Sequence, residues 1–205
     1  METTEMTTYS NILTVAKKEF LDKGYPKASL RHIAKNAGVT TGALYGYFKN
    51  KESLFDCLVE ESYIGLKEFY MEILKKFFSL PTDEQMYHME EYTVESAKDM
   101  LNYIYDHYDE FKLIICRSEG TKYANMIHEL AQLDLDATHA FAKTTHQAGL
   151  DTQYVHPVLE HLLTSGMFTT FSEFIAHDIS RDEALEMSVP LIAFYSAGWK
   201  RIMGF

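Results

Sequence analysis

The chain has little of what a disulfide-stapled or turn-rich protein needs. Its 205 residues include only two cysteines, four prolines and ten glycines. Two cysteines cannot build a framework of disulfides, so we expect a protein of a reducing compartment, the cytoplasm. So few glycines and prolines also disfavour an all-β fold with many tight turns.

Signals for export and for membrane insertion are missing as well. The N-terminal stretch METTEMTTYS has neither the basic nor the apolar region of a signal peptide. No apolar run approaches the roughly 18 residues that a membrane span requires. We therefore expect a soluble protein without a membrane partner.

Signatures of catalysis are absent too. The sequence contains no glycine-rich phosphate loop and no Gly-x-Ser-x-Gly motif. Its nine histidines never lie three or four residues apart, so no two of them share a helical turn as metal ligands. Cys57 and Cys116 fall in helical apolar stripes and are interpreted as small buried hydrophobes. We predict no enzyme, no metal site and no cofactor.

Charge is divided unevenly along the chain. The net charge is −11, yet residues 1–55 carry eight basic against five acidic residues. Between Tyr25 and Lys51 there are five basic residues and no acid. A basic island on an acidic chain favours a small part that meets a polyanion, while the remainder serves another purpose. Chance clustering is the alternative.

Helical periodicity runs through the whole sequence. Apolar residues recur every three to four positions, and Gly24, Gly38 and Pro81 are placed to end helices. We find no credible strand or repeat, and predict an all-α protein of about nine helices. Three short helices and the start of a fourth form residues 1–55, and longer helices fill residues 56–205.

The most informative segment extends from Ser29 to Phe55. Two short helices are joined by a turn at Gly38, where a positive φ lets the chain turn sharply. On the second helix the outward residues are short or hydroxylated and carry no acid. A helix that meets only water usually displays Glu and Lys, so this surface is typical of a recognition helix in a DNA major groove.

These residues resemble the DNA-binding domain of TetR-family transcriptional repressors. The resemblance rests on Asp22-Lys23-Gly24-Tyr25, Ile33-Ala34, Ala37-Gly38-Val39, Gly42, Leu44-Tyr45, Tyr47-Phe48-Lys49-Asn50-Lys51-Glu52 and Leu54. It implies an all-α homodimer that binds operator DNA through residues 1–55, with a larger domain at 56–205 for a small-molecule effector and for dimerisation. Gly46 departs from the family, which often has a larger polar or aromatic residue there.

Nine residues are the candidates for contacting DNA. Thr40, Thr41 and Ala43 are expected at base edges, with a helix-capping role as the alternative for Thr40. The remaining candidates, which we expect at phosphates or on a solvated face, are Ser29, Arg31, Tyr45, Tyr47, Lys49 and Lys51.

The second domain supplies two further sets of candidates. Methionines and aromatics at helical spacing are either core or the lining of an adaptable effector pocket, and a pocket of this kind suits an apolar or cationic molecule. The proposed lining is Met89, Tyr92, Met100, Tyr103, Tyr123, Met126 and Ile127. The last two helices carry apolar residues on more than one face, which predicts a dimer interface. Its candidates are Leu159, Leu162, Leu163, Gly166, Phe174, Val189, Ile192 and Trp199.

The sequence thus predicts a ligand-responsive repressor that binds a palindromic operator as a homodimer. Two alternatives remain open at this stage. One is a constitutive repressor or an activator without small-molecule input. The other is a helical interaction module or enzyme whose basic patch is incidental.

Overall fold

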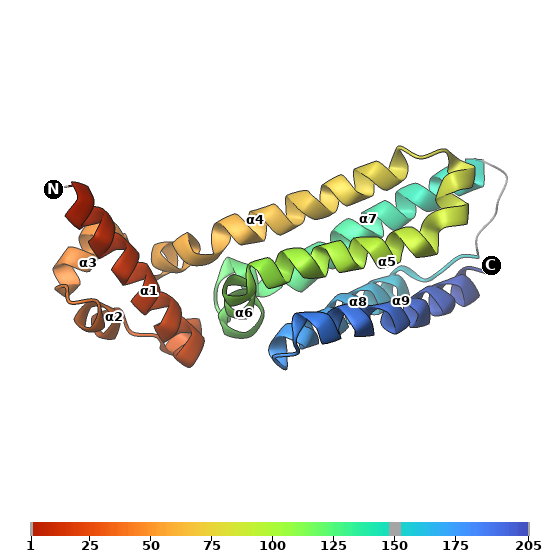
Figure 1. Cartoon of the computed structure of the whole chain (residues 1–205). Helices are drawn as coiled ribbons and strands as arrows, with labels where there is room; N and C mark the ends of the chain where they lie inside the picture. Colours follow the sequence, from red (N-terminus) through yellow and green to blue (C-terminus); the bar gives the residue numbers. More distant parts are fainter. Residues whose placement is uncertain (1, 148–152, 205) are drawn as a thin grey trace. The chain divides into compact units, whose positions relative to one another are not determined.

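The computed structural model describes residues 2–147 and 153–204, with most of their side chains. The described residues form nine α-helices and one short 3₁₀ helix, and no strand (Figure 1). The all-α prediction is confirmed. The helices are α1 (Glu2–Lys27), α2 (Leu30–Asn36), α3 (Thr41–Tyr47), α4 (Lys51–Phe78), α5 (Thr82–Asp106), α6 (Tyr108–Arg117), η1 (Lys122–Asn125), α7 (Met126–Gln147), α8 (Pro157–Ala176) and α9 (Arg181–Met203).

The helices divide into two compact units, and the division does not follow chain order. Unit 1 consists of Met1–Ile64 and His107–Ala124, and unit 2 of Gly65–Asp106 and Asn125–Phe205. The helix α4 therefore begins in unit 1 and ends in unit 2. No helix in the described part of the chain is long and apolar enough to cross a membrane.

In unit 1, α1 packs on both α2 and α6, and α2 packs on α3. The inner side of α1 is fully closed to solvent at Ile12, Ala16 and Phe20. The Phe20 ring meets the Phe55 ring edge-on, with the centroids 5.1 Å apart. This aromatic contact joins the first helix to the start of α4, so the helix-turn-helix has its own core.

The end of α1 differs from the expectation that Gly24 closes this helix in a left-handed cap. Gly24 breaks the helix with φ 73° and ψ 160°, which is not a left-handed cap. One more turn, containing Pro26, follows before the chain reaches α2. The backbone N–H of Ala28 closes this turn on the carbonyl of Gly24 at 3.0 Å. Proline is tolerated here because it stands in the first turn after the break, where its missing N–H costs nothing.

The burial predicted for Cys57 is wrong. Cys57 is exposed, and Cys116 is half-buried. Cys57 follows the buried Phe55 by two positions, about 200° around the helix, so it points away from the core. Its thiol lies against the Tyr9 hydroxyl at the surface of unit 1.

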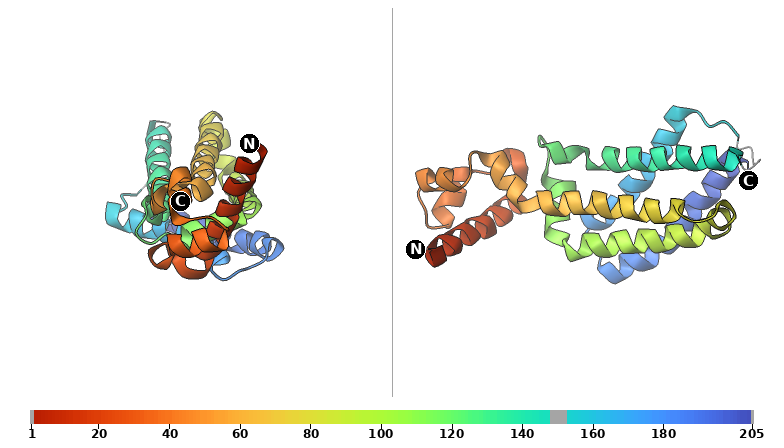
Figure 2. Two further views of the ribbon diagram at one scale, coloured as in Figure 1. Left: turned by 90° about the vertical axis from the view of Figure 1, so that its left-hand side faces the viewer. Right: turned by 90° about the horizontal axis from the view of Figure 1, so that it is seen from above.

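In unit 2, α5 packs on α9, α7 packs on α8, and α8 and α9 also meet. Figure 2 shows these pairs from two further directions. The second half of α4 reaches α5 through the ring pair Phe69–Tyr103, with centroids 5.7 Å apart. Phe77 reaches both α5 and α7, since its ring contacts Tyr92 at 5.2 Å and Phe141 at 5.8 Å.

Candidate DNA-binding surface

The helix-turn-helix is held in place by capped helix ends. The Ser29 hydroxyl accepts from the backbone N–H of His32 at 3.4 Å, and the Thr40 hydroxyl accepts from that of Ala43 at 3.0 Å. The Thr40 side chain therefore caps α3, which was one of its two predicted roles. Between the two helices, Gly38 takes φ 72° and the Val39 N–H bonds to the Ala34 carbonyl at 3.0 Å.

A buried carboxylate supports the start of α2. Glu19 is only 7% exposed, and it accepts from the Ser29 N–H at 3.2 Å and contacts His32 Nδ1 at 2.6 Å. Burial alone would raise the pKa of Glu19, but the bonds from His32 and Ser29 outweigh it and lower this pKa. Glu19 thus couples α1 to the entry of the helix-turn-helix, a role that the sequence analysis missed.

The outward face of α3 is open. Leu44 is fully buried and Phe48, just beyond the helix, is nearly so, whereas Tyr45 is 52% and Tyr47 38% exposed. The predicted base-reading residues Thr41 and Ala43 are half-buried and exposed, respectively. Tyr47 leans toward α1, since its ring centroid lies 6.2 Å from that of Tyr9. Gly46 has open space where a side chain would project.

Two predicted phosphate contacts, Lys49 and Lys51, are placed differently from each other. Lys49 is exposed beside the start of α4. The Lys51 ammonium instead donates to the carbonyls of Pro26 at 3.1 Å and Ala28 at 3.2 Å, and lies 4.7 Å from the centroid of the Tyr25 ring. Burial lowers the pKa of Lys51. An ammonium has three N–H donors, and two of these are used within the protein.

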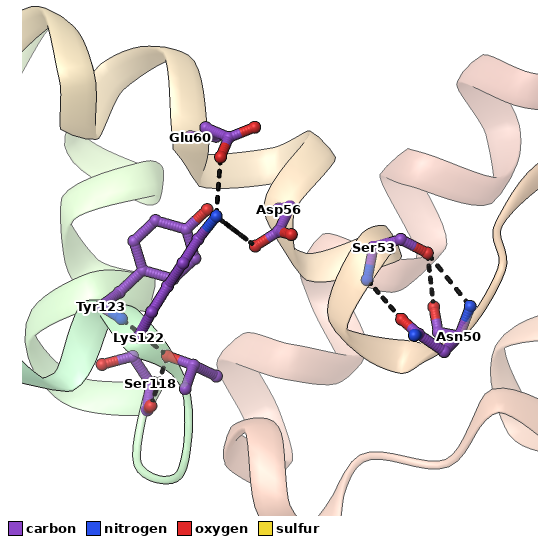
Figure 3. A network of polar contacts seen from close by, with 8 residues as sticks. Asn50, Ser53, Asp56, Glu60, Ser118, Lys122 and Tyr123 are labelled. Atoms are coloured by element: carbon purple, nitrogen blue, oxygen red, sulfur yellow. Dashed lines mark hydrogen bonds and ion pairs between the residues drawn. The ribbon is translucent and has the colours of Figure 1, made fainter.

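The N-terminus of α4 is capped reciprocally by Asn50, which lies between these two lysines in the sequence, and Ser53. Figure 3 shows Asn50 Oδ1 accepting from the Ser53 N–H at 2.7 Å, and Ser53 Oγ accepting from the Asn50 N–H at 3.1 Å. These bonds satisfy backbone donors that a helix start leaves unpaired. The other two DNA candidates, Ser29 and Arg31, are both exposed near the start of α2.

Comparison with known proteins agrees with this geometry. Residues 12–58 match the family described as bacterial regulatory proteins, tetR family. This part of the chain is therefore similar to the N-terminal domain of the TetR family. The match covers α2, α3 and the start of α4, which are the elements that carry the exposed surface.

Curated proteins similar to this chain include bacterial regulators. The chain is 39% identical to the HTH-type transcriptional regulator AcrR of Shigella flexneri over 108 residues. These residues are 51% of this chain and 50% of AcrR. The chain is 40% identical over 53 residues to the fatty acid metabolism regulator protein of Bacillus subtilis, 26% of this chain and 27% of that protein. The chain thus matches half or less of the length of these relatives.

The likeness in fold extends over most of the chain. A Bacillus subtilis FadR structure in complex with stearoyl-CoA superposes with a TM-score of 0.57 at 17% identity, over 91% of this chain and 97% of FadR. A TetR-family regulator from Streptomyces coelicolor A3 gives 0.58 at 19% identity, over 90% and 88%. At such identities the likeness shows the fold alone.

The predicted effector residues do not lie together in one unit. Tyr92, Met100 and Tyr103 lie half-buried on α5, and Met126 and Ile127 begin α7, all in unit 2. The Tyr92 hydroxyl already donates to the Ile73 carbonyl at 2.6 Å. The side chain of Met89 lies outside the described residues.

Tyr123, by contrast, belongs to unit 1 and is almost wholly buried there. Its hydroxyl donates to Asp56 at 2.7 Å, while the neighbouring Lys122 ammonium bonds to Glu60 at 2.7 Å (Figure 3). Burial, and then the bond to Asp56, raises the pKa of Tyr123 well above its ordinary value. These bonds fasten η1 to α4, so the Tyr123 hydroxyl is already used within unit 1.

The predicted dimer residues separate into two groups. Phe174 and Ile192 are buried inside unit 2, and Leu163, Gly166 and Trp199 are half-buried. Leu159, Leu162 and Val189 are exposed, with Leu162 at 62%. The exposed group is joined by other large apolar side chains on the same two helices, which are Val158, Met187 and Phe194.

Proposed function

We propose that the chain is a DNA-binding transcriptional regulator that inserts α3 into the major groove. The observation that carries this is the outward face of α3, which is exposed, free of acids and fixed by a capped turn. Phosphate repels carboxylates, so a surface without acids between a basic α2 and Lys49 suits a polyanion. The TetR-family match over residues 12–58 supports the same function.

The proposed contacts follow from exposure. Thr41 and Ala43 are short enough to bring the α3 backbone close to base edges, where methyl groups meet thymine. Thr40 caps α3 beside them. The phosphate contacts we propose are Ser29, Arg31, Tyr45, Tyr47 and Lys49, together with the one remaining N–H of Lys51.

The working form we propose is a homodimer. The exposed apolar side chains of α8 and α9, foremost Leu159, Leu162 and Val189, support a helical interface between two copies. Twofold symmetry would set the two recognition helices about 34–36 Å apart, on successive major grooves of a palindrome. In this proposal residues 1–55 bind DNA, and residues 56–205 hold the effector and the interface.

We further propose that the regulator is a repressor released by a small molecule bound in unit 2. Release is a population shift, because the effector stabilises a state whose recognition helices no longer match the operator. The half-buried Tyr92, Met100, Tyr103 and Ile127 are the supporting residues on this chain. A FadR of similar fold has been solved in complex with stearoyl-CoA, which supports a small-molecule ligand for this chain.

An electrophoretic mobility shift with DNA from upstream of the protein's own gene tests DNA binding. Ala43→Glu places a carboxylate against phosphate and bases and is expected to abolish the shift, whereas Ala43→Ser, which adds no charge, retains it. If both variants bind as the parent does, α3 is not the reading helix. Addition of effector candidates to the same assay separates an inducible regulator from a constitutive one.

A further inference from the structure

A histidine covers a buried carboxylate at the surface of the helix-turn-helix. His32, in α2, is the one histidine among residues 1–64 of the sequence. Its Nδ1 lies 2.6 Å from Oε2 of Glu19, in α1. The side chain of Glu19 is 8% exposed and that of His32 is 54% exposed. The imidazole is therefore the outer layer over a charge that water barely reaches.

The second ring nitrogen of His32 faces an amide. Nε2 lies 3.1 Å from Nδ2 of Asn36, one helical turn further along α2. An amide nitrogen only donates and an ionised carboxylate only accepts, so these contacts fit a neutral ring with its hydrogen on Nδ1. A second proton, on Nε2, needs a new acceptor. Either the Asn36 amide turns its oxygen to the ring, or an acceptor outside the protein takes the bond.

Glu19 is the negative charge of this surface, and cations flank it. Burial would raise the pKa of Glu19, but the bond from His32 and the nearby Lys23 help to lower it, so the carboxylate is ionised at neutral pH. On α2 the exposed cations are Arg31 and Lys35. The helix α3, which packs on α2, has no Asp, Glu, Lys, Arg or His in its sequence. One proton on His32 therefore neutralises the only acid that the ring contacts.

His32 lies among the proposed phosphate contacts. Its backbone N–H donates to the Ser29 hydroxyl at 3.4 Å, and the exposed Arg31 precedes it. A neutral ring in front of Glu19 leaves a negative charge beside the phosphates, which repel it. A protonated ring removes this repulsion and offers Nε2–H to a phosphate oxygen as a charged donor. The contact belongs to the imidazole and not to the backbone N–H groups of this seven-residue helix.

We propose that His32, positioned by Glu19, is a phosphate contact of the operator complex and takes up a proton when DNA binds. The inference rests on the proposed DNA-binding function and adds regulation by pH to the same surface. Histidine ordinarily titrates near pH 6.5, and an adjacent phosphate favours its charged form. The bound state then holds more protons than the free state, so operator affinity increases as pH falls from 8 to 6.

The test measures operator affinity of the full chain by fluorescence anisotropy between pH 8 and pH 6, at constant ionic strength. For the parent we expect an increase of about tenfold per copy of the chain over this range. His32→Gln stays polar but cannot titrate, and it is expected to keep the parent's pH 8 affinity throughout. His32→Lys is charged at every pH tested, and it is expected to keep the parent's pH 6 affinity throughout.

A similar pair in unit 2 provides the matched control. His139 of α7 lies 3.0 Å from Glu160 of α8, and their side chains are 57% and 12% exposed. His139→Gln is expected to leave the pH dependence of operator binding as in the parent, because this pair is not part of the helix-turn-helix.

Salt dependence identifies phosphate as the acceptor. In the parent, the slope of log affinity against log salt is expected to be steeper at pH 6 than at pH 8 by about 0.9 per copy. In His32→Gln the two slopes are expected to be equal. If the Asn36 amide took the bond instead of DNA, the parent's slope would not change with pH.

Glu19→Gln tests the positioning role of the carboxylate. It keeps an acceptor for His32 and for the Ser29 N–H while removing the charge. Its operator affinity is expected to increase less than that of the parent between pH 8 and pH 6, since the charged ring has lost its counter-charge. Circular dichroism checks that this variant is folded, and if it is not, the two His32 variants decide the proposal.

The proposal is overturned if the parent binds operator equally well at pH 6 and pH 8, or if His32→Gln keeps the parent's pH dependence. It is also overturned if His32→Lys binds no better than His32→Gln at pH 8, or if the parent's salt slope is the same at both pH values. Operator binding without any pH dependence would remove only the His32 contact. Absence of operator binding by the parent at every pH would instead overturn the proposed DNA-binding function.

Discussion

Lys49 and Lys51 lie two positions apart and have the same chemistry, yet their surroundings predict opposite outcomes when each is changed to alanine. Lys49 is exposed at the proposed DNA surface. The Lys51 ammonium lies on the carbonyls of Pro26 and Ala28 and over the Tyr25 ring. Lys49→Ala should therefore weaken DNA binding, and Lys51→Ala should first of all destabilise unit 1.

The magnitudes follow from these contacts. Two partly exposed bonds from a charged donor, together with one cation–π contact, are worth about 2 kcal/mol in total, which Lys51→Ala removes. Lys49→Ala should leave the free energy of unfolding within about 0.5 kcal/mol of the parent value. Each phosphate contact adds about 0.9 to the dependence of binding on log salt, so losing Lys49 from both copies of a dimer lowers the slope by about 1.8.

Chemical denaturation measures the stabilities, and fluorescence anisotropy on operator DNA between 50 and 200 mM salt measures the slopes. Lys51→Arg keeps the positive charge and a long side chain, and serves as a control for the loss of the ammonium group itself. The reasoning is refuted if Lys51→Ala unfolds at the denaturant concentration of the parent while its salt slope falls as that of Lys49→Ala does. Such a result would show that Lys51 turns outward to phosphate.

Three other predictions concern stability and assembly. Gly38→Ala should cost about 1–2 kcal/mol because φ is positive there, whereas Gly46→Ala, in an equally open position, should add about 0.5 kcal/mol; equal effects in thermal melts would contradict the conformational argument. Because the pKa of Glu19 is lowered on folding, its carboxylate stabilises the protein above its ordinary pKa of 4.5, and this stability is lost as pH falls further. Glu19→Gln should therefore reduce the dependence of the melting temperature on pH between pH 6 and 3. An unchanged dependence would assign the acid sensitivity to another group. Leu162→Glu should shift the chain to monomers in sedimentation at micromolar concentration, while Thr169→Glu at another exposed position of α8 should not; a dimer in both cases would move the interface off α8.

The helices and the exposed outward face of α3 were predictable because both are local properties. Apolar spacing shows which side of a helix turns inward, and a glycine at position 38 with a hydroxyl at position 40 shows where one helix stops and the next begins. The end of α1 was harder, since whether one more turn follows Gly24 depends on contacts that Ala28 and Lys51 make with it.

Partners across the fold could not be predicted from spacing. Periodicity indicates that Tyr70 of α4 and Asp134 of α7 both face inward, but it does not indicate that the Tyr70 hydroxyl bonds to Asp134 across 64 residues. Likewise, nothing in the composition distinguishes Tyr123, bound to Asp56 in unit 1, from the aromatic residues of unit 2.

The interrupted course of the chain through unit 1 has a consequence for synthesis on the ribosome. The helix-turn-helix emerges first, but α1 is packed by α6, and Lys17 pairs with Glu110, a residue 93 positions later. The unit is completed only when Ala124 has been made. At about 5–20 residues per second, the segment after Ile64 takes roughly 3–12 s to appear. During that interval the nascent N-terminal helices present the uncovered side of α1, to which chaperones can bind.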